Sequence, residues 1–576
     1  MSGTGAGTLR VAAAQFAVGP DLEANLAACL HALDGAGEGG AGLVVLPEFC
    51  NHLSWYDDAA HCYRVSLDLD GPFLAAIAGR ARQIGAYVVV NCTLRRGGGA
   101  ASGSSLMFSP AGELLGVSDK QVLMGHENDF LRRAEAASPL LQAGGARVAM
   151  YACMDGVINE TPRCLALRGA QVLCNSLNSF AFDEGSLHVP VRAAENRVFV
   201  VAANKVGPLV PEALVGAISE STGIPAPFLD GAGESQVVAP DGEVLARAQR
   251  RGEQVVFADI SPARAENKRR PGGSDIFAAR RPELYGAIAA DPAGQAEGAG
   301  RGAAVVEAAA IQLQSAGVEA IAEARQRCAA AFDAGVQLAV LPELFCFEQA
   351  RVDDAAEAAR RTEQAVAALA AACGAQGFAV ASLVQRQGAA FRHAALLIGG
   401  GGVLAAQPQL HRCARHPWAE PGEGVVLHNL PFGRVGMVVG EDSIYPETFR
   451  LLALAGAEIA AASLNVEEDW ELRLGLVERA AENRLNLVAA SRAESGGSLA
   501  AALVEDFTLM TPWKEREFDG LISQPEVQRA AGAGALRAQL RPAAAANKLL
   551  SHRTHLLRDR PWPLLDALTA ARGETR

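Results

Sequence analysis

Along the first half of the chain, short apolar runs alternate with stretches in which apolar residues recur every three or four positions. Short runs bounded by turn residues predict buried strands, and the longer period predicts amphipathic helices. We expect strands at residues 9–14, 43–46, 86–93, 105–108, 114–117, 148–152, 171–174 and 198–203. The clearest helix follows Asp21, where Leu22, Leu26, Leu30 and Leu33 share one face. This alternation, with hairpins among the strands, predicts layered α/β structure.

The second half of the chain repeats motifs of the first half in the same order. Leu46-Pro47-Glu48-Phe49 returns as Leu341-Pro342-Glu343-Leu344, and Arg192-Ala193-Ala194-Glu195-Asn196-Arg197 returns as Arg479-Ala480-Ala481-Glu482-Asn483-Arg484. The fixed order and slowly drifting offset indicate a tandem duplication of one domain of about 280 residues. The expected limits are a first domain at residues 1–289, a Gly/Ala-rich linker at 290–304 and a second domain at 305–576.

The composition and charge of the chain exclude several classes of protein. The 576 residues, 50% of them hydrophobic, are enough for two or more cores. A net charge of −13 argues against a nucleic-acid surface. The eleven cysteines are never spaced as CxxC, which favours a reduced cytoplasm over a disulfide framework or a zinc site. The N-terminus lacks a signal-peptide pattern, and no apolar run reaches the roughly 18 residues of a membrane span. We therefore expect a soluble, cytoplasmic protein without nucleic-acid or membrane partners.

Three residues, Cys153, Glu48 and Lys120, come directly after predicted strands and are candidates for catalysis. Cys153 ends the apolar run 148–152 and is followed by the turn residues Asp155 and Gly156, so it lies at a strand-to-helix corner. The alternative is that Cys153 is a small buried hydrophobe, as most cysteines are. Glu48 follows another apolar strand, at the end where crevices of α/β sheets open. Lys120 follows the predicted hairpin, in a chain whose other lysines are only Lys205, Lys268, Lys514 and Lys548.

A thiol, a carboxylate and an ammonium suit attack on a carbon–nitrogen bond. Glu48 would take the proton of the thiol and later activate water. Cys153 would add to a carbonyl or nitrile carbon and form a covalent intermediate. Lys120 and the backbone N–H of Met154 would hold the developing negative charge. This scheme needs no metal and no cofactor.

These motifs, in their order and spacing, resemble the nitrilase, or carbon–nitrogen hydrolase, superfamily. The resemblance covers the first half and includes the motifs around Glu48 and Glu195, Asp119-Lys120 and residues 147–155. It also includes Gly233-Glu234-Ser235, Pro240-Asp241-Gly242 and residues 281–286. It implies an αββα sandwich in each repeat, which would form four layers, and a triad of Glu48, Lys120 and Cys153. It further suggests Glu127 as a second glutamate near the lysine, and a structural role for the Arg192–Arg197 motif.

The second repeat departs from the family pattern at the site itself. Glu343 is the counterpart of Glu48, but Gly440 falls at the place of Cys153. The chain has no lysine between Lys268 and Lys514, so the ammonium is missing as well. We therefore expect a degenerate pseudoenzyme domain. Because members of the superfamily commonly pair two sandwiches about a local two-fold axis, we expect this copy to serve as the partner in an internal pseudo-dimer. Further homo-oligomerisation and ligand binding by the degenerate cleft stay open.

The sequence also favours one branch of the superfamily. Cys153-Met154-Asp155 resembles the pattern of amidases, whereas nitrilases more often carry cysteine-tryptophan-glutamate. This favours hydrolysis of a small amide, most simply a linear one, or of a carbamoyl (ureido) group, with water as co-substrate and release of ammonia or an amine. Nitrile hydrolysis and acyl transfer by the same triad are alternatives, as is a non-catalytic binding or assembly protein. The residues expected to wall the pocket are Trp55, Tyr56, Asn178, Ser179 and Phe180.

Overall fold

The computed structural model describes residues 7–293 and 302–571, so most of the expected linker at 290–304 lies outside the described residues. The chain forms two compact units, and neither is one continuous segment. Unit 1 comprises Met1–Asn267, Asp506–Ser523 and Leu549–Arg576, and unit 2 comprises Lys268–Glu505 and Gln524–Lys548. The limits expected from the motifs describe sequence repeats, whereas each compact unit also includes segments of the other repeat.

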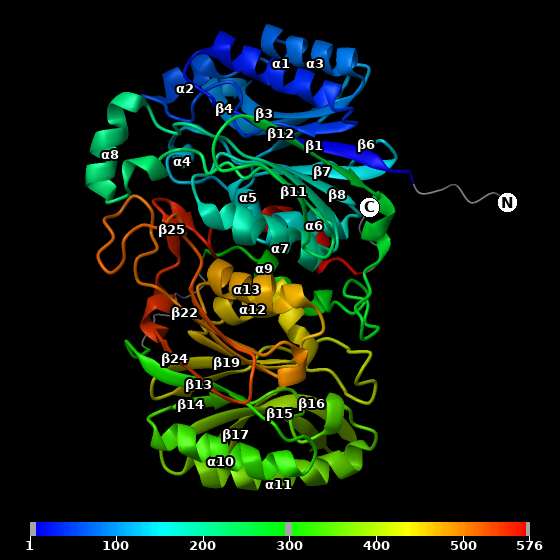
Figure 1. Ribbon diagram of the computed structural model, residues 1–576, viewed down its shortest axis with the longest axis vertical. Coiled ribbons are helices and arrows are strands. Elements are labelled where there is room, and N and C mark those ends of the chain that lie inside the picture. Colours follow the sequence, from blue (N-terminus) through cyan, green and yellow to red (C-terminus); the bar gives the residue numbers. More distant parts are fainter. Residues whose placement is uncertain (1–6, 294–301, 572–576) are drawn as a thin grey trace, which may run out of the picture. The chain divides into compact units, whose positions relative to one another are not determined.

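Unit 1 is built on two six-stranded sheets (Figure 1). The first has the order β12 (Gln254–Ile260), β1 (Leu9–Gln15), β2 (Leu43–Val45), β3 (Tyr87–Arg96), β4 (Ala100–Phe108) and β5 (Leu114–Asp119). The second has the order β11 (Val244–Arg247), β10 (Gln236–Val238), β9 (Phe199–Ala203), β8 (Val172–Ser176), β7 (Ala146–Ala152) and β6 (Leu141–Ala143). The strands β1, β2 and β3 run parallel, as do β7, β8 and β9.

The alternation of side chains along these strands separates two cores. Val11 and Val45 face the second sheet and pack with Val148 and Val201. Their neighbours Ala12, Val44 and Val88 face the other way and pack with helices α1 (Leu22–Glu38) and α3 (Pro72–Ile84). Helices α6 (Glu160–Leu167) and α7 (Val189–Asn196) contact the second sheet. The layers are therefore helix, sheet, sheet and helix, as expected.

Strand β4 begins earlier than the apolar pattern predicts. Residues 105–108 were expected as the strand, but Ala100–Phe108 pairs with β3 along its whole length. The added residues are small or polar, and Ser104 donates a hydrogen bond of 2.6 Å to Asp119. A backbone ladder does not require apolar side chains, so this extension leaves no hydrophobic signal.

Unit 2 repeats the same topology, which confirms the tandem duplication. One sheet has the order β17 (Gly402–Pro408), β16 (Ala390–Gly399), β15 (Phe378–Gln387), β14 (Leu338–Val340), β13 (Val306–Gln312) and β24 (Gly534–Leu540). The other has the order β18 (Leu427–Leu430), β19 (Gly433–Val439), β20 (Ile459–Leu464), β21 (Asn486–Ser491), β22 (Ser498–Ala502) and β23 (Glu526–Ala530). Helices α10 (Glu319–Asp333) and α11 (Ala355–Cys373) cover the first of these sheets. Within residues 7–293 and 302–571, no helix has the length and apolar character to cross a bilayer.

Candidate active site

Cys153 occupies a strained turn between β7 and the short helix α5 (Met154–Val157). Its φ is +47° and its ψ is −106°, a conformation that residues other than glycine rarely adopt. Its backbone N–H lies 3.0 Å from the carbonyl oxygen of Ser176 and 3.1 Å from the side-chain oxygen of Asn175, and donates to both. Because these acceptors stand at the carboxyl end of β8, the parallel sheet itself holds the thiol at the edge of the sandwich.

Two buried charged residues, Asp155 and Arg192, hold this turn in place by hydrogen bonds. One carboxylate oxygen of Asp155 accepts hydrogen bonds from the backbone N–H groups of Gln121 (3.0 Å) and Val122 (2.7 Å). The turn is thus tied to the segment that follows Lys120. The guanidinium of Arg192 donates to the carbonyl oxygen of Gly156 at 2.7 Å. These contacts agree with the structural role expected for the Arg192–Arg197 motif.

Lys120 lies between two carboxylates. Its Nζ is 2.8 Å from Oε1 of Glu48 and 2.8 Å from Oε2 of Glu127. Lys120 and Glu48 are fully buried, and Glu127 is mostly buried. The backbone N–H of Met124 also donates to Glu127, at 2.9 Å. The structure therefore brings both glutamates expected from the sequence to the same ammonium.

Burial and the unequal number of charges shift the pKa values of this group. Burial raises the pKa of Glu48 to about 7; Lys120 opposes the shift and Glu127 adds to it. Burial alone would lower the pKa of Lys120, but Glu127 and Glu48 raise it well above its ordinary value. Burial, followed by the charge of Glu48, raises the pKa of the Cys153 thiol. At neutral pH the group therefore holds a thiol, an ammonium and a carboxyl group that can exchange a proton.

Cys153 opens into a cavity of about 360 Å³ within unit 1. Of the residues expected to wall the pocket, Trp55, Tyr56, Asn178 and Phe180 line it. Ser179 does not, because its hydroxyl accepts a hydrogen bond from the backbone N–H of Ala181. The other lining residues are Ser54, Met124, Gly125, His126, Glu127, Phe130, Leu209, Val210, Leu229, Leu509, Met510, Ser551 and His552.

Four of these lining residues come from the second repeat and were missed by sequence reasoning. Leu509 and Met510 belong to the segment Asp506–Ser523, and Ser551 and His552 to Leu549–Arg576, both of which are part of unit 1. The repeat motifs do not predict that these segments pack in unit 1. They show only which residues of the two repeats correspond.

Comparison with known proteins decides the family. The model of the carbon–nitrogen hydrolase family matches residues 10–270 and, a second time, residues 304–533. The chain belongs to the carbon–nitrogen hydrolase family. Both repeats of this hydrolase carry the match, including the one that lacks the thiol.

The relatives of this carbon–nitrogen hydrolase are distant. A nitrilase of Pyrococcus abyssi is 29% identical over 251 residues, which cover 43% of this chain and 88% of the relative. An N-carbamoylputrescine amidase of Solanum tuberosum is 25% identical over 290 residues, which cover 48% of this chain and 93% of the relative. Among solved structures, an amidase of the nitrilase superfamily from Nesterenkonia is 24% identical with a TM-score of 0.40, covering 48% of this chain and 95% of its own.

The second repeat keeps the backbone frame of this site but has neither the thiol nor the lysine. Gly440 takes the same turn as Cys153, with φ of +49°. The backbone N–H of Glu343 donates to Leu464 at 3.0 Å, as that of Glu48 donates to Leu177 at 3.1 Å. Asp442 binds the backbone N–H groups of Leu410 and His411, just as Asp155 binds those of Gln121 and Val122. By this register, Gln409 stands at the place of Lys120.

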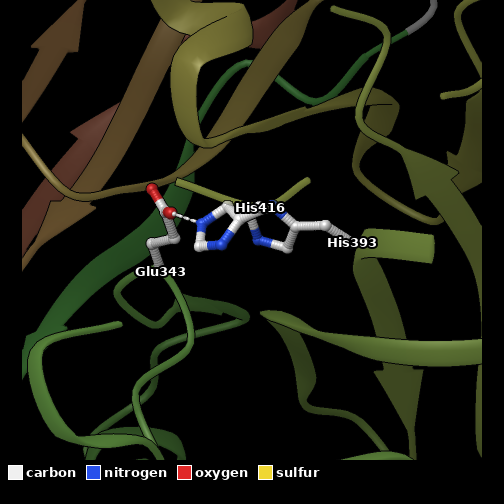
Figure 2. A group of neighbouring side chains, drawn as sticks. All are labelled: Glu343, His393 and His416. Carbon is white, nitrogen blue, oxygen red and sulfur yellow. Dashed lines mark hydrogen bonds and ion pairs between the residues drawn. The ribbon is translucent and has the colours of Figure 1, made fainter. Parts of the chain in front are cut away.

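Glu343 has acquired other partners in this cleft. His416 Nε2 lies 2.8 Å from Oε1 of Glu343, and the ring of His393 packs edge-on against that of His416 (Figure 2). Arg415 Nη1 donates to the same carboxylate oxygen at 2.9 Å. Burial by itself would raise the pKa of Glu343, but Arg415 and His416 hold it well below its usual range.

Glu343, His393 and His416 offer the donor types of a metal site, and their donor atoms lie within 4.8 Å of one another. The surroundings do not fit a cation. The guanidinium of Arg415 already pairs with the carboxylate and lies 3.5 Å from His416 Nε2, which is itself 2.8 Å from the same carboxylate oxygen. Both ring nitrogens of His393 are hydrogen-bonded, to Ser382 and Gln409. This cluster is therefore best described as an ion pair with supporting hydrogen bonds.

Proposed function

We propose that this carbon–nitrogen hydrolase cleaves the amide bond of a small amide, or the carbamoyl group of a ureido compound, through a thioester on Cys153. One observation carries the proposal: Lys120 pairs with both Glu48 and Glu127 beside a thiol that faces a cavity. Nucleophile, base and cation are the three parts that such a reaction needs.

In this mechanism Glu48 transfers protons and Cys153 forms the covalent bond to the substrate. Glu48 takes the proton from the Cys153 sulfur as the sulfur attacks the carbonyl carbon. Lys120 and the backbone N–H of Met154 stabilise the negative oxygen of the tetrahedral intermediate. Glu48 returns the proton to the nitrogen, the carbon–nitrogen bond breaks, and ammonia or an amine leaves. Water, deprotonated by Glu48, attacks the thioester, and the acid leaves as the sulfur regains a proton.

The raised pKa of Glu48 suits this sequence of proton transfers. A carboxyl group with a pKa of about 7 is both a competent base for the thiol and a competent acid for the leaving nitrogen at neutral pH. Glu127 is assigned to holding Lys120 in place and protonated, since its two oxygens accept from Lys120 and from the backbone of Met124.

The same thioester would also serve nitrile hydrolysis or transfer of the acyl group to an acceptor other than water. One distant relative is named a nitrilase and another an N-carbamoylputrescine amidase. The Cys153-Met154-Asp155 pattern favours the amide or carbamoyl substrate. A non-catalytic binding protein is the alternative from another class, and the assembled Glu48, Lys120 and Cys153 argue against it.

We assign catalysis to the first repeat and a non-catalytic role to the second. Gly440 carries no nucleophile, and Gln409 carries no charge to stabilise an oxyanion. The role as a permanent partner in an internal pseudo-dimer, and a cytoplasmic location, are parts of the same proposal.

The test is ammonia release from matched panels of primary amides, ureido compounds and nitriles, together with intact-mass detection of an acyl adduct. We expect turnover of amides or ureido compounds, an adduct that maps to Cys153, and loss of both in Cys153→Ala. Turnover that persists in Cys153→Ala, or a folded protein that forms no adduct with any of the three classes, would contradict the proposal.

A further inference from the structure

Apolar side chains form most of the wall of the Cys153 cavity. These are Trp55, Met124, Phe130, Phe180, Leu209, Val210, Leu229, Leu509 and Met510. Several of them continue into a buried cluster that includes Met154, next to the nucleophile. A ligand that fills this cavity therefore exchanges water for hydrocarbon over most of its surface.

The cavity offers a ligand few charged partners. Among its described lining residues there is no lysine, arginine or aspartate, and the one glutamate is Glu127. Two histidines also line it, His126, whose Nδ1 lies 3.1 Å from Asp129, and His552. The carboxylate of Glu127 already accepts from Lys120 and from the backbone of Met124. A substrate carboxylate or ammonium in the acyl chain would lose its water without meeting a lysine, an arginine or an unpaired carboxylate in the described lining, which is costly.

Two buried side-chain oxygens of the described lining residues have no hydrogen-bond partner, the hydroxyl oxygen of Tyr56 and the amide oxygen of Asn178. The Asn178 oxygen can only accept a hydrogen bond. Asn178 follows the carboxyl end of β8, as Cys153 follows that of the neighbouring strand β7. A buried acceptor of this kind is costly unless a ligand supplies a donor. The N–H of a primary amide is such a donor.

The two segments of the second repeat are held firmly where they line the cavity. The backbone N–H of Leu509 donates to Leu550 at 2.8 Å, which joins one segment to the other. The backbone N–H of Gly125 donates to the hydroxyl of Thr554 at 2.8 Å, and that of Phe182 donates to Gly520 at 2.7 Å. Leu509 and Met510 are therefore a fixed part of the wall.

We propose that the cavity binds an uncharged primary amide with an apolar acyl group. The amide nitrogen lies at Asn178, and the acyl chain lies against the wall to which Leu509 and Met510 of the second repeat contribute. This inference rests on the proposed amide hydrolysis and names its substrate class. It also assigns the degenerate repeat a direct part in substrate selection.

The test uses the full chain and four amides: hexanamide, acetamide, the cationic 6-aminohexanamide and the anionic monoamide of adipic acid. We expect kcat/KM for hexanamide to be roughly 100-fold higher than for either charged amide. We also expect it to be about tenfold or more higher than for acetamide. Equal or better turnover of a charged amide would overturn the inference while leaving amide hydrolysis intact. No turnover of any amide and no acylation of Cys153 would remove both.

A matched pair of variants tests the wall itself. Met510→Lys places a cation on the cavity, and we expect about a tenfold loss with hexanamide and about a tenfold gain with the adipic monoamide. Thr511→Lys adds the same charge one residue further on, at an exposed position outside the lining, and should leave both values within about twofold. Met510→Gln repeats the test without a charge and should lower only the hexanamide value. Equal behaviour of the two lysine variants would overturn the assignment.

Discussion

The side-chain nitrogen of Lys120 lies 2.8 Å from a carboxylate oxygen of Glu48 and 2.8 Å from one of Glu127. One buried cation thus faces two carboxylates. Burial raises the pKa of Glu48 to about 7, because the single charge of Lys120 offsets the cost of burial only in part and Glu127 adds to the shift.

The first prediction is the pH dependence of turnover. Glu48 must be ionised to accept the thiol proton, so kcat/KM should fall as the pH is lowered through about 7, by about tenfold for each further unit. The raised pKa of Lys120 keeps the ammonium charged across this range. Glu48→Gln should lose roughly 10²- to 10⁴-fold and show no such slope. A wild-type profile that is flat between pH 5.5 and 8 would speak against Glu48 as the base.

The second prediction concerns stability without the cation. Lys120→Met leaves Glu48 and Glu127 buried and facing each other, which should lower the free energy of unfolding by about 3–5 kcal/mol at pH 8. Protonation relieves this repulsion, because the pKa of a buried carboxyl group without a cation rises further. The loss should therefore be smaller at pH 5.5. Urea unfolding at both pH values measures it, and the double variant Lys120→Met/Glu127→Gln should recover part of the loss at pH 8. An equal loss at both pH values would contradict the argument.

The third prediction is that Thr554, in the second repeat, positions Glu127. Its hydroxyl accepts from the backbone N–H of Gly125 at 2.8 Å and donates to the carbonyl oxygen of Leu123 at 3.2 Å. Thr554→Val keeps the shape but removes both bonds, so stability should fall by about 1–3 kcal/mol and kcat/KM by about tenfold.

Three further measurements separate positioning by Thr554 from a general loss of structure. The acidic limb of the pH profile should move in Thr554→Val, because Glu127 contributes to the pKa of Glu48. Thr554→Ser should restore both activity and profile. Thr511→Val, which removes an exposed hydroxyl bonded within its own loop, should change neither. If Thr554→Val lowers the stability but leaves the pH profile of kcat/KM unchanged, Thr554 has a structural role only.

The fourth prediction is that a thiol cannot be restored to the second repeat by one substitution. In a Cys153→Ala background, Gly440→Cys should stay about a thousandfold or more below the wild-type turnover. A Cβ at Gly440 would lie 2.9 Å from Oε2 of Glu343, and the carboxylate cannot move away freely because Arg415 and His416 hold its other oxygen, Oε1. Ammonia release and intact mass measure the outcome. Clear turnover by this variant would refute the description of the second repeat as a pseudoenzyme.

Much of the fold was predictable because its signals are local. The alternation of apolar residues in β1, β2 and β7 reflects two cores on opposite faces of each sheet. Glu48 and Cys153 each come directly after an apolar strand, so their positions at the ends of strands were predictable. The extension of β4 over small polar residues left no such signal, since backbone pairing does not depend on side-chain polarity.

The walls of the site were predictable only in part. Trp55, Tyr56, Asn178 and Phe180 follow closely on Glu48 or on the end of β8, and they line the cavity. Ser179 stands between two of them, yet it does not line the cavity, and its hydroxyl accepts a hydrogen bond from the backbone of Ala181.

The sequence by itself determined the duplication, the α/β layering and the candidate residues Glu48, Lys120 and Cys153, because each rests on periodicity or on motifs within one stretch of chain. The tertiary structure alone decided that Leu509, Met510, Ser551 and His552 of the second repeat complete a cavity around Cys153 of the first. It also placed Arg415 on Glu343. Both are contacts between residues far apart in the chain, and which distant segments meet depends on how whole surfaces pack, which no local pattern records.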